Sequence, residues 1–257
     1  MFRVVIPARY ASTRLPGKAL LPLGGKPMVQ WVYERALAAG AAEVLIATDD
    51  ERISAAARGF GAEAVMTSRG HACGSDRIAE VARMRRWAPG EIVVNVQGDE
   101  PLMPPADIAQ VAGLLAAQAS ADIATLATPI DSPAELVDPN IVKVVTDARG
   151  MALYFSRAPI PWNRDGAQAG SDGREACAGA RRHRGLYAYR VAALLRLAQL
   201  PAGALEQREK LEQLRALEHG LAIYVGDALE QPGPDVNTAA DLESVAALLT
   251  PGTAVRR

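Results

Sequence analysis

The chain alternates short apolar runs with longer segments in which apolar residues recur every three or four positions. The apolar runs predict buried strands over residues 4–6, 44–47, 64–66, 92–97 and 123–128. The amphipathic segments predict helices over residues 27–40, from 49 onward, 78–86 and 104–117. Strands that alternate with helices in this way are typical of an α/β protein with a mainly parallel sheet.

The pattern changes to extended segments after residue 130. Residues 141–146 and 151–156 flank an Asp-Ala-Arg-Gly turn and predict a hairpin. The segment 183–190 alternates with period two, so His183, Gly185, Tyr187 and Tyr189 share a face. Further elements are predicted as a helix over 206–219, a strand over 223–225 and a helix over 239–249. We therefore expect one domain over 1–257 with an inserted β-rich subdomain at about 130–190.

Composition limits the classes of function. A chain of 257 residues with 49% hydrophobic content can bury a large core. Lysine and arginine total 28 against 29 acidic residues, so no overall positive charge favours a nucleic-acid partner. Cys73 and Cys177 are too few for a disulfide framework, and no apolar run has membrane-spanning length. We expect a cytoplasmic protein with neither a nucleic-acid nor a membrane partner.

The loop after the first strand concentrates positive charge. Arg9, Arg14 and Lys18 follow the buried run directly, and hydroxyl groups and a Pro-Gly turn lie between them. Because open α/β sheets bind ligands at the carboxyl ends of their strands, these cations are placed to surround a polyphosphate. The loop lacks the glycine spacing of a dinucleotide fingerprint or a Walker loop. The alternative is a solvated surface loop with incidental charges.

A carboxylate is predicted to lie beside this loop. The strand over 92–97 ends at Gly98, where the backbone can turn sharply, and Asp99 follows. A carboxylate combined with substrate phosphates is the usual way to hold Mg²⁺, so Asp99 is the candidate metal ligand. The alternative is that Asp99-Glu100-Pro101 serves only as a turn.

Other candidate residues have competing structural explanations. Arg77 lies in the first turn of a predicted helix, where a cation opposes the helix dipole, and this indicates a ligand partner. Ser75 can cap the same helix. Arg157 and Arg164 could hold a carboxylate, while His183 and Tyr187 could donate to a sugar. A lone histidine is nevertheless more often structural.

The run Ile-Pro-Ala-Arg-Tyr-Ala-Ser-Thr-Arg-Leu-Pro-Gly-Lys at 6–18 resembles the opening loop of sugar nucleotidyltransferases, and it is most similar to that of the 3-deoxy-manno-octulosonate cytidylyltransferases. Gln-Gly-Asp-Glu-Pro at 97–101 and Leu-Glu-Gln-Leu-Arg at 211–215 agree with that resemblance, which extends from Val4 to about Leu249. It implies a three-layer, Rossmann-like nucleotidyltransferase fold with a β-rich dimerisation appendage and a homodimer. It also implies transfer from CTP to 3-deoxy-manno-octulosonate with Mg²⁺, giving the CMP-sugar and pyrophosphate for lipopolysaccharide synthesis.

The resemblance also implies residue roles. The catalytic residues are expected to be Arg14, Lys18 and Asp99. Nucleotide contacts are expected from Pro7, Ala8, Arg9, Arg14, Lys18, Ser75, Arg77 and Gln97. Sugar contacts are expected from Gln97, Arg157, Arg164, His183, Tyr187, Glu212 and Gln213. Metal contacts are expected from Asp99 together with Asn237 or Asp235.

Two departures from the family pattern keep other functions open. Asn237 stands where the family carries a second metal-binding aspartate, and Cys73 and Ser75 replace a serine and a threonine. A neutral carbonyl can still bind Mg²⁺, but more weakly than a carboxylate. One alternative is the same chemistry on another 2-keto-3-deoxy sugar acid, including an amino-sugar or nine-carbon acid. The other is a catalytically idle nucleotide-binding paralogue.

Overall fold

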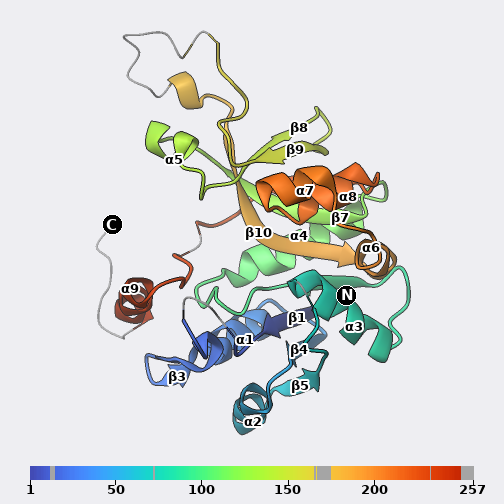
Figure 1. Ribbon diagram of the computed structural model, residues 1–257, viewed down its shortest axis with the longest axis vertical. Helices are drawn as coiled ribbons and strands as arrows, with labels where there is room; N and C mark the ends of the chain where they lie inside the picture. The colour runs from blue at the N-terminus through green and yellow to red at the C-terminus, as the bar shows by residue number, and fades with distance from the viewer. Residues whose placement is uncertain (12–14, 72, 165, 167–174, 232, 250–257) are drawn as a thin grey trace.

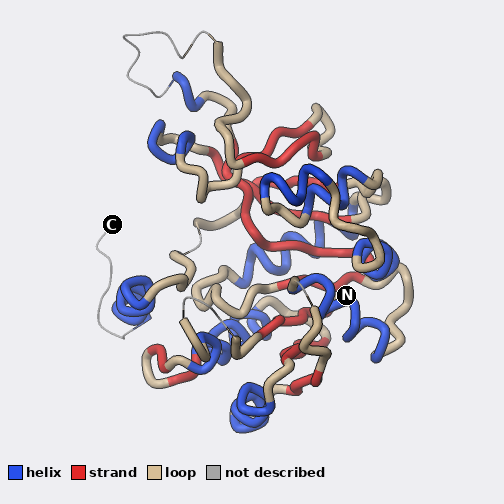
Figure 2. The backbone as a smooth tube through the Cα atoms, viewed as in Figure 1, coloured by secondary structure: helices blue, strands red, loops and turns tan. Residues whose placement is uncertain are grey.

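The computed structural model describes residues 1–11, 15–71, 73–164, 166, 175–231 and 233–249, and it shows a sheet covered by helices on both faces (Figures 1 and 2). The central path of the sheet has the order β11-β7-β10-β6-β1-β4-β5. Its strands are β1 (Arg3–Ala8), β4 (Glu43–Thr48), β5 (Glu63–Met66), β6 (Ile92–Asn95), β7 (Ile123–Pro129), β10 (Arg181–Arg190) and β11 (Ile223–Asp227). All the strand pairs along this path are parallel except those made by β10, which runs antiparallel to β6 and β7. The expected α/β fold is confirmed.

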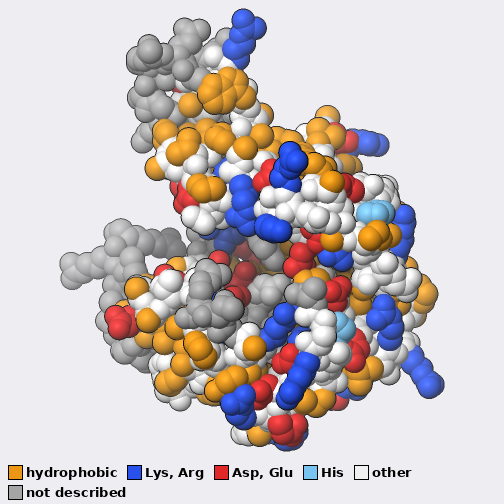
Figure 3. Space-filling model, viewed as in Figure 1, with side chains coloured by type: hydrophobic (Ala, Val, Ile, Leu, Met, Phe, Trp, Pro, Cys, Tyr) orange, Lys and Arg blue, Asp and Glu red, His pale blue; other side chains and the backbone are white. Residues whose placement is uncertain are grey.

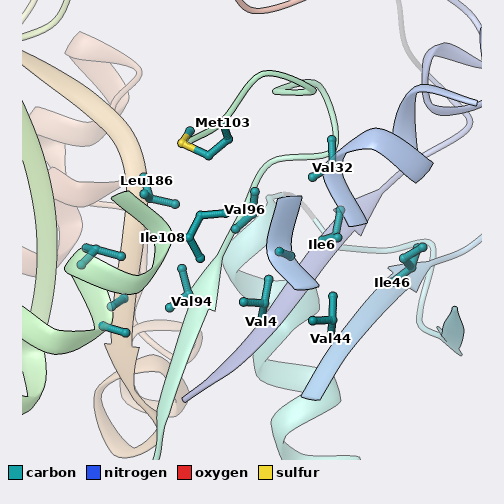
Figure 4. Packing of buried hydrophobic residues seen from close by; sticks show 14 of the residues in the cluster. Val4, Ile6, Val32, Val44, Ile46, Val94, Val96, Met103, Ile108 and Leu186 are labelled. Carbon is teal, nitrogen blue, oxygen red and sulfur yellow. The ribbon is translucent and has the colours of Figure 1, made fainter. Parts of the chain in front are cut away.

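Alternate residues of β1 enter two different cores. Val4 and Ile6 pack on one face, and Val5 packs on the other. Figure 4 shows the first face, where Ile6 lies near Val32 and Val4 lies between Val94 and Val44. A fully buried aliphatic side chain stabilises the fold by about 1.5–3 kcal/mol, so these strands fix the loops at their carboxyl ends firmly.

Helices complete the three layers. The face of Val4 is covered by α1, α2 and α4, and the face of Val5 by α3, α6 and α8. The helices are α1 (Met28–Ala38), α2 (Glu51–Gly59), α3 (Gly74–Met84), α4 (Pro105–Ala117), α5 (Pro133–Val137), α6 (Val191–Leu197), α7 (Ala204–Glu209), α8 (Gln213–Glu218) and α9 (Ala239–Leu249). Within the described ranges, no helix combines the length and apolar character needed to cross a membrane.

The expected hairpin is present. Strands β8 (Lys143–Thr146) and β9 (Ala152–Ser156) pair antiparallel, and β8 joins the sheet through β10 (Figure 1). However, residues 187–190 of β10 pair with β6 and β7 in the middle of the sheet. The segment predicted as an insertion therefore shares its last strand with the central sheet.

The prediction of one helix over 206–219 is wrong. Lys210 adopts a left-handed conformation, with φ 55° and ψ 47°, and separates α7 from α8. Leu211 and Leu214 are buried, and Glu206 pairs with Arg215. The break turns the Lys210-Leu211-Glu212 segment toward the sheet.

The last helix holds a loop close to the sheet. In α9, the Thr238 hydroxyl accepts a hydrogen bond from the Asp241 amide, and the Asp241 carboxylate accepts from the amides of Asn237 and Thr238. Thr238 is thus the capping residue of α9. Because Val245 packs in a small core with Leu23, the loop before the helix is anchored beside the first strands.

Candidate functional site

The loop after β1 delivers Lys18 to the carboxyl end of the sheet. Gly17 has φ 68°, and its amide donates to the Tyr10 carbonyl across 2.9 Å. A side chain at Gly17 would meet the Tyr10 ring at 3.1 Å, so this turn requires glycine both for its backbone angle and for space. A short 3₁₀ helix, η1 (Lys18–Leu20), follows directly. The lysine is thereby held at the end of β1.

Lys18 meets Asp99 there. The Lys18 Nζ atom lies 2.7 Å from Asp99 Oδ2. The amide of Val236 donates to the Asp99 carbonyl across 3.1 Å, which brings the loop before α9 to the same place. Segments far apart in the sequence therefore converge on one carboxylate, as expected for Asp99.

A cavity of about 580 Å³ opens beside this ion pair, and we call it the first cavity. Figure 3 shows the molecule hollowed between its two halves, with side chains of both charges around the hollow. The predicted site residues that line the first cavity are Pro7, Ala8, Arg9, Lys18, Gln97, Asp99, Glu212 and Asn237. Arg14 lies outside the described residues.

Negative charge accumulates next to the first cavity. Burial raises the pKa of Glu100 well above its ordinary value, and the neighbouring Asp235 and Asp99 raise it further. The pKa of Asp235 is raised by its enclosed position and then by Asp99. Crowded carboxylates of this kind fit a divalent cation, which would relieve their repulsion.

The part of the chain that the structure describes does not bring three carboxylate, imidazole or thiol groups together as a complete metal site. A hard cation held by one or two carboxylates and by substrate phosphates does not need such a group. Asp99 with Asn237 or Asp235 fits that arrangement.

A second cavity, of about 300 Å³, lies on the adjoining part of the sheet. Its predicted residues are Ser75, Gln97, His183, Tyr187, Glu212 and Gln213. His183, Gly185, Tyr187 and Tyr189 of β10 all line it, which confirms that they share a face. The His183 ring lies 5.0 Å from the Phe155 ring and 5.2 Å from the Tyr187 ring, and its Nε2 is 3.1 Å from Thr125 Oγ1.

The ionisable groups of the second cavity are shifted toward their neutral forms. Burial, with a smaller contribution from Arg184, lowers the pKa of His183 to about 3. Burial also raises the pKa of Tyr187 well above its usual range, and it raises that of Glu212. The hydroxyl of Tyr187 is buried and has no hydrogen-bond partner among the described residues. Since an unpaired buried hydroxyl is costly, this group points to a polar ligand in the cavity.

Gln97 and Glu212 line both cavities. Ser75 Oγ donates to Glu212 Oε2 across 3.3 Å, and Cys73 Sγ lies 3.0 Å from Ser75 Oγ. Ser75 therefore does not cap α3, in which Cys73 occupies the N-cap position. The two cavities meet at this polar boundary, so ligands bound in them would be neighbours.

The structure corrects the argument made for Arg77. Its side chain is fully buried and pairs with Asp49 Oδ2 at 2.8 Å, and it also donates to Thr67. The cation that opposes the helix dipole thus has a protein partner. Asp50 caps α2, so Asp49 and Asp50 both have structural roles.

The two arginines predicted to hold a carboxylate are absent from the lining of either cavity. Arg157 donates from Nε to the Glu209 carbonyl and from Nη1 to the Pro139 carbonyl, both across 2.8 Å. Arg164 is exposed in the segment after β9. These positions contradict the expectation that this chain brings both guanidinium groups to its own sugar site.

Sequence reasoning missed several residues at the two cavities. Asn95, Tyr189 and Lys210 line the second cavity, and Glu100 adds a buried carboxyl beside the first. Asn95 carried a signal, because it is the one polar residue in an apolar run. Lys210 carried none, since its place depends on a break in a segment that looks helical.

A model of the family described as "Cytidylyltransferase" matches residues 3–223. The 3-deoxy-manno-octulosonate cytidylyltransferase of Thioalkalivibrio sulfidiphilus is 56% identical over 249 residues, covering 96% of this chain and 98% of the relative. The enzyme of the same name from Halorhodospira halophila is 55% identical over 245 residues, covering 95% of each.

Solved structures agree. A CMP:2-keto-3-deoxy-manno-octonic acid synthetase complexed with CTP superposes with a TM-score of 0.86 at 44% identity, covering 96% of this chain and 98% of that one. A nucleotidyl transferase from Methanothermobacter has a TM-score of 0.61 at 18% identity over 96% of this chain and 97% of that one, and so shows the fold alone.

Proposed function

This chain belongs to the family of 3-deoxy-manno-octulosonate cytidylyltransferases, and on that premise we propose that it transfers the cytidylyl group of CTP to 3-deoxy-manno-octulosonate and releases pyrophosphate. The observation that carries the proposal is the joining of a charged cavity to a neutral one at Gln97 and Glu212. A polyphosphate suits the first cavity, and a polyhydroxylated sugar suits the second.

The reaction is an in-line displacement. A sugar hydroxyl oxygen forms a bond to the α-phosphorus of CTP, the bond from that phosphorus to the bridging oxygen breaks so that pyrophosphate leaves, and the hydroxyl proton passes to solvent. Lys18 holds the phosphates, and Gln97 lies where the two substrates meet. Because no covalent enzyme intermediate forms, positioning and electrostatics supply the rate enhancement.

We propose Mg²⁺ as the cofactor, held by Asp99 with Asn237 or Asp235. When bound, such an ion neutralises phosphate charge and activates the attacking hydroxyl. The raised pKa values of Glu100 and Asp235 support a cation at this place. Lys18 pairs with Asp99, and binding of the phosphates would draw the lysine toward them.

The test is release of pyrophosphate from CTP. We expect release with 3-deoxy-manno-octulosonate, weaker release with an eight-carbon amino-sugar analogue or a nine-carbon acid, and none without an acid. Lys18→Met should abolish most of the rate, whereas Lys26→Met, which removes a lysine paired with Glu34 outside the site, should not. If pyrophosphate release is faster with another acid, that acid is the substrate. If no acid supports release, the chain is a catalytically idle nucleotide-binding paralogue.

The proposal extends to the setting of the enzyme. We infer a cytoplasmic homodimer whose CMP-sugar product feeds lipopolysaccharide synthesis. The dimer is supported by large exposed apolar side chains in and near the hairpin, including Val137, Leu153 and Trp162. Sedimentation at micromolar concentration should give twice the chain mass of 27.1 kDa, and Leu153→Glu should weaken the association.

A further inference from the structure

The second cavity must accommodate a carboxylate if the proposed function is correct, because the substrate is a sugar acid. Its lining is mostly neutral: His183 is uncharged at neutral pH, and the tyrosines keep their protons. Glu212 adds an acidic group that would repel an anion. Among the described residues that line this cavity, Lys210 is the one lysine or arginine.

Lys210 is held in place by the break between α7 and α8. Its amide donates to the Glu206 carbonyl across 2.8 Å and ends α7. With φ 55° the chain then turns, so that Lys210, Leu211, Glu212 and Gln213 all line the second cavity. Lys210 therefore contributes to the wall of the second cavity.

Its ammonium group is available for a ligand. Glu206, four residues earlier, is the expected helical partner, but its carboxylate is held by Arg215, whose Nε is 2.7 Å from Glu206 Oε2. Across the described ranges, Lys210 forms no ion pair. Arg215 therefore neutralises the Glu206 carboxylate, which would otherwise pair with Lys210.

The other cations near the site are committed elsewhere. Arg157 binds two backbone carbonyls, and Arg184 interacts with Glu100 and Asp235 next to the first cavity. On these grounds, and resting on the proposed function, we propose that Lys210 recognises the carboxylate of the sugar acid. An ion pair in this partly enclosed cavity distinguishes the acid from its neutral derivatives.

The backbone at Lys210 supports a functional role. A lysine with positive φ is strained, and glycine would adopt the same conformation without strain. Strain of this kind is commonly retained where a side chain has a function. Lys210→Gly should therefore unfold at a temperature no lower than wild type while it loses recognition of the acid, which separates a binding defect from a folding defect.

The experiment compares 3-deoxy-manno-octulosonate with its methyl ester, the ester being measured as substrate or as competitive inhibitor. In Lys210→Gln, the KM for the acid should rise about tenfold, while affinity for the ester and the KM for CTP stay near wild type. Lys210→Arg should recover part of the loss. Arg208→Gln, which removes an exposed cation from α7, the helix that ends at Lys210, and lies outside the cavity, is the matched control and should change none of these values.

Each outcome has a defined meaning. If the KM for the acid in Lys210→Gln stays within twofold of wild type, the assignment is wrong. Equal losses for acid and ester also overturn it, because they indicate lost packing rather than lost charge. If wild type turns over no sugar acid at all, the proposed function fails and this inference fails with it.

Discussion

The first and second cavities adjoin each other, but they treat charge in opposite ways. In the first, Lys18 and Asp99 form an ion pair with 2.7 Å between nitrogen and oxygen. In the second, the imidazole of His183 and the phenols of Tyr187 and Tyr189 are held neutral by burial. One cavity therefore presents full charges, and the other presents mainly uncharged hydrogen-bonding groups.

The difference follows from the positions of the two cavities in the sheet. The first is built from loops at the carboxyl ends of β1 and β6, where solvent keeps ionised groups hydrated. The second rests on β10, an antiparallel strand between β6 and β7 whose Tyr187 and Tyr189 are buried. Parallel strand ends thus supply charges for phosphates, and the inserted antiparallel strand supplies neutral donors for a sugar.

Removing the central carboxylate should have the largest effect. Asp99→Asn keeps the size of the side chain but removes the charge that pairs with Lys18 and that we assign to Mg²⁺. We expect the rate of pyrophosphate release to fall by about 100-fold or more at ordinary Mg²⁺. The measurement is the initial rate over a Mg²⁺ titration, with CTP and the sugar acid saturating.

A matched control exists on α1. Glu34→Gln breaks the Lys26–Glu34 pair, which has nearly the same length, 2.8 Å, but lies outside both cavities. It should leave the rate within about twofold, because an exposed ion pair contributes only about 0–1 kcal/mol. If Asp99→Asn behaves like Glu34→Gln, the first cavity does not owe its function to charge.

Charging the second cavity should destabilise the fold. Unfolded His183 gains its proton near its ordinary pKa of 6.5, whereas folded His183 gains it only near about 3. Its contribution to stability is therefore complete above pH 6.5 and is lost as the pH falls toward 3, at up to about 1.4 kcal/mol per pH unit. His183→Gln keeps a polar group beside Thr125 and should flatten this dependence.

Urea unfolding of wild type and His183→Gln at several pH values between 7.5 and 4.5 checks this prediction. The difference in unfolding free energy between the two proteins should shrink or reverse as the pH falls. If the unfolding free energies of the two proteins change with pH in parallel, folded His183 takes up its proton at the same pH as unfolded His183. The contrast between the cavities would then be lost.

Asn237→Asp should strengthen the charged character of the first cavity. A second carboxylate beside Asp99 offers Mg²⁺ a better ligand than an amide oxygen does. The Mg²⁺ concentration for half-maximal rate should fall about threefold or more, and Asp235→Ala should raise it. Titrations of the rate against Mg²⁺ for the three proteins provide the measurement.

Thermal unfolding provides an independent check on Asn237→Asp. Without Mg²⁺, repulsion between the new carboxylate and Asp99 should lower the free energy of unfolding by up to about 1 kcal/mol relative to wild type. With Mg²⁺ added, the variant should instead be the more stable protein. The cap of α9 is made by Thr238 and Asp241, so it remains intact. Identical Mg²⁺ titrations for all three proteins would leave Asp99 as the one supported protein ligand.

The sequence predicts the first cavity better than the second for a physical reason. The residues around Lys18 and Asp99 directly follow buried parallel strands, and the ends of such strands meet at one edge of the sheet. Strand patterns therefore suffice to bring them together. The wall of the second cavity depends instead on β10 entering the sheet centre and on the break at Lys210, and neither is encoded by local periodicity.

Misassigned cations illustrate the same limit. Arg77 lies in the first turn of a helix and looks unsatisfied in sequence, but Asp49, on a neighbouring strand end, neutralises it. Arg157 looks available for a carboxylate, but it binds carbonyls that the fold leaves unpaired. Whether a charge is free for a ligand is decided by tertiary contacts, so residue type and spacing cannot decide it.

The smallest effect is expected at the boundary between the cavities, where Cys73 contacts Ser75. Burial and then the neighbouring Glu212 raise the pKa of the Cys73 thiol to about 12. At pH 8 the thiol therefore stays protonated, so Cys73 should react slowly with iodoacetamide and should not act as a nucleophile. Cys73→Ser supplies a better hydrogen-bond donor to Ser75 and Glu212, so the rate should stay within about threefold of wild type. The rate of pyrophosphate release and alkylation followed by mass spectrometry provide the measurements. Fast alkylation of Cys73 together with a large loss of rate in Cys73→Ser would show that this thiol is ionised and takes part in the reaction. The boundary between the cavities would then be charged, and the neutral part of the second cavity would start only at Tyr189.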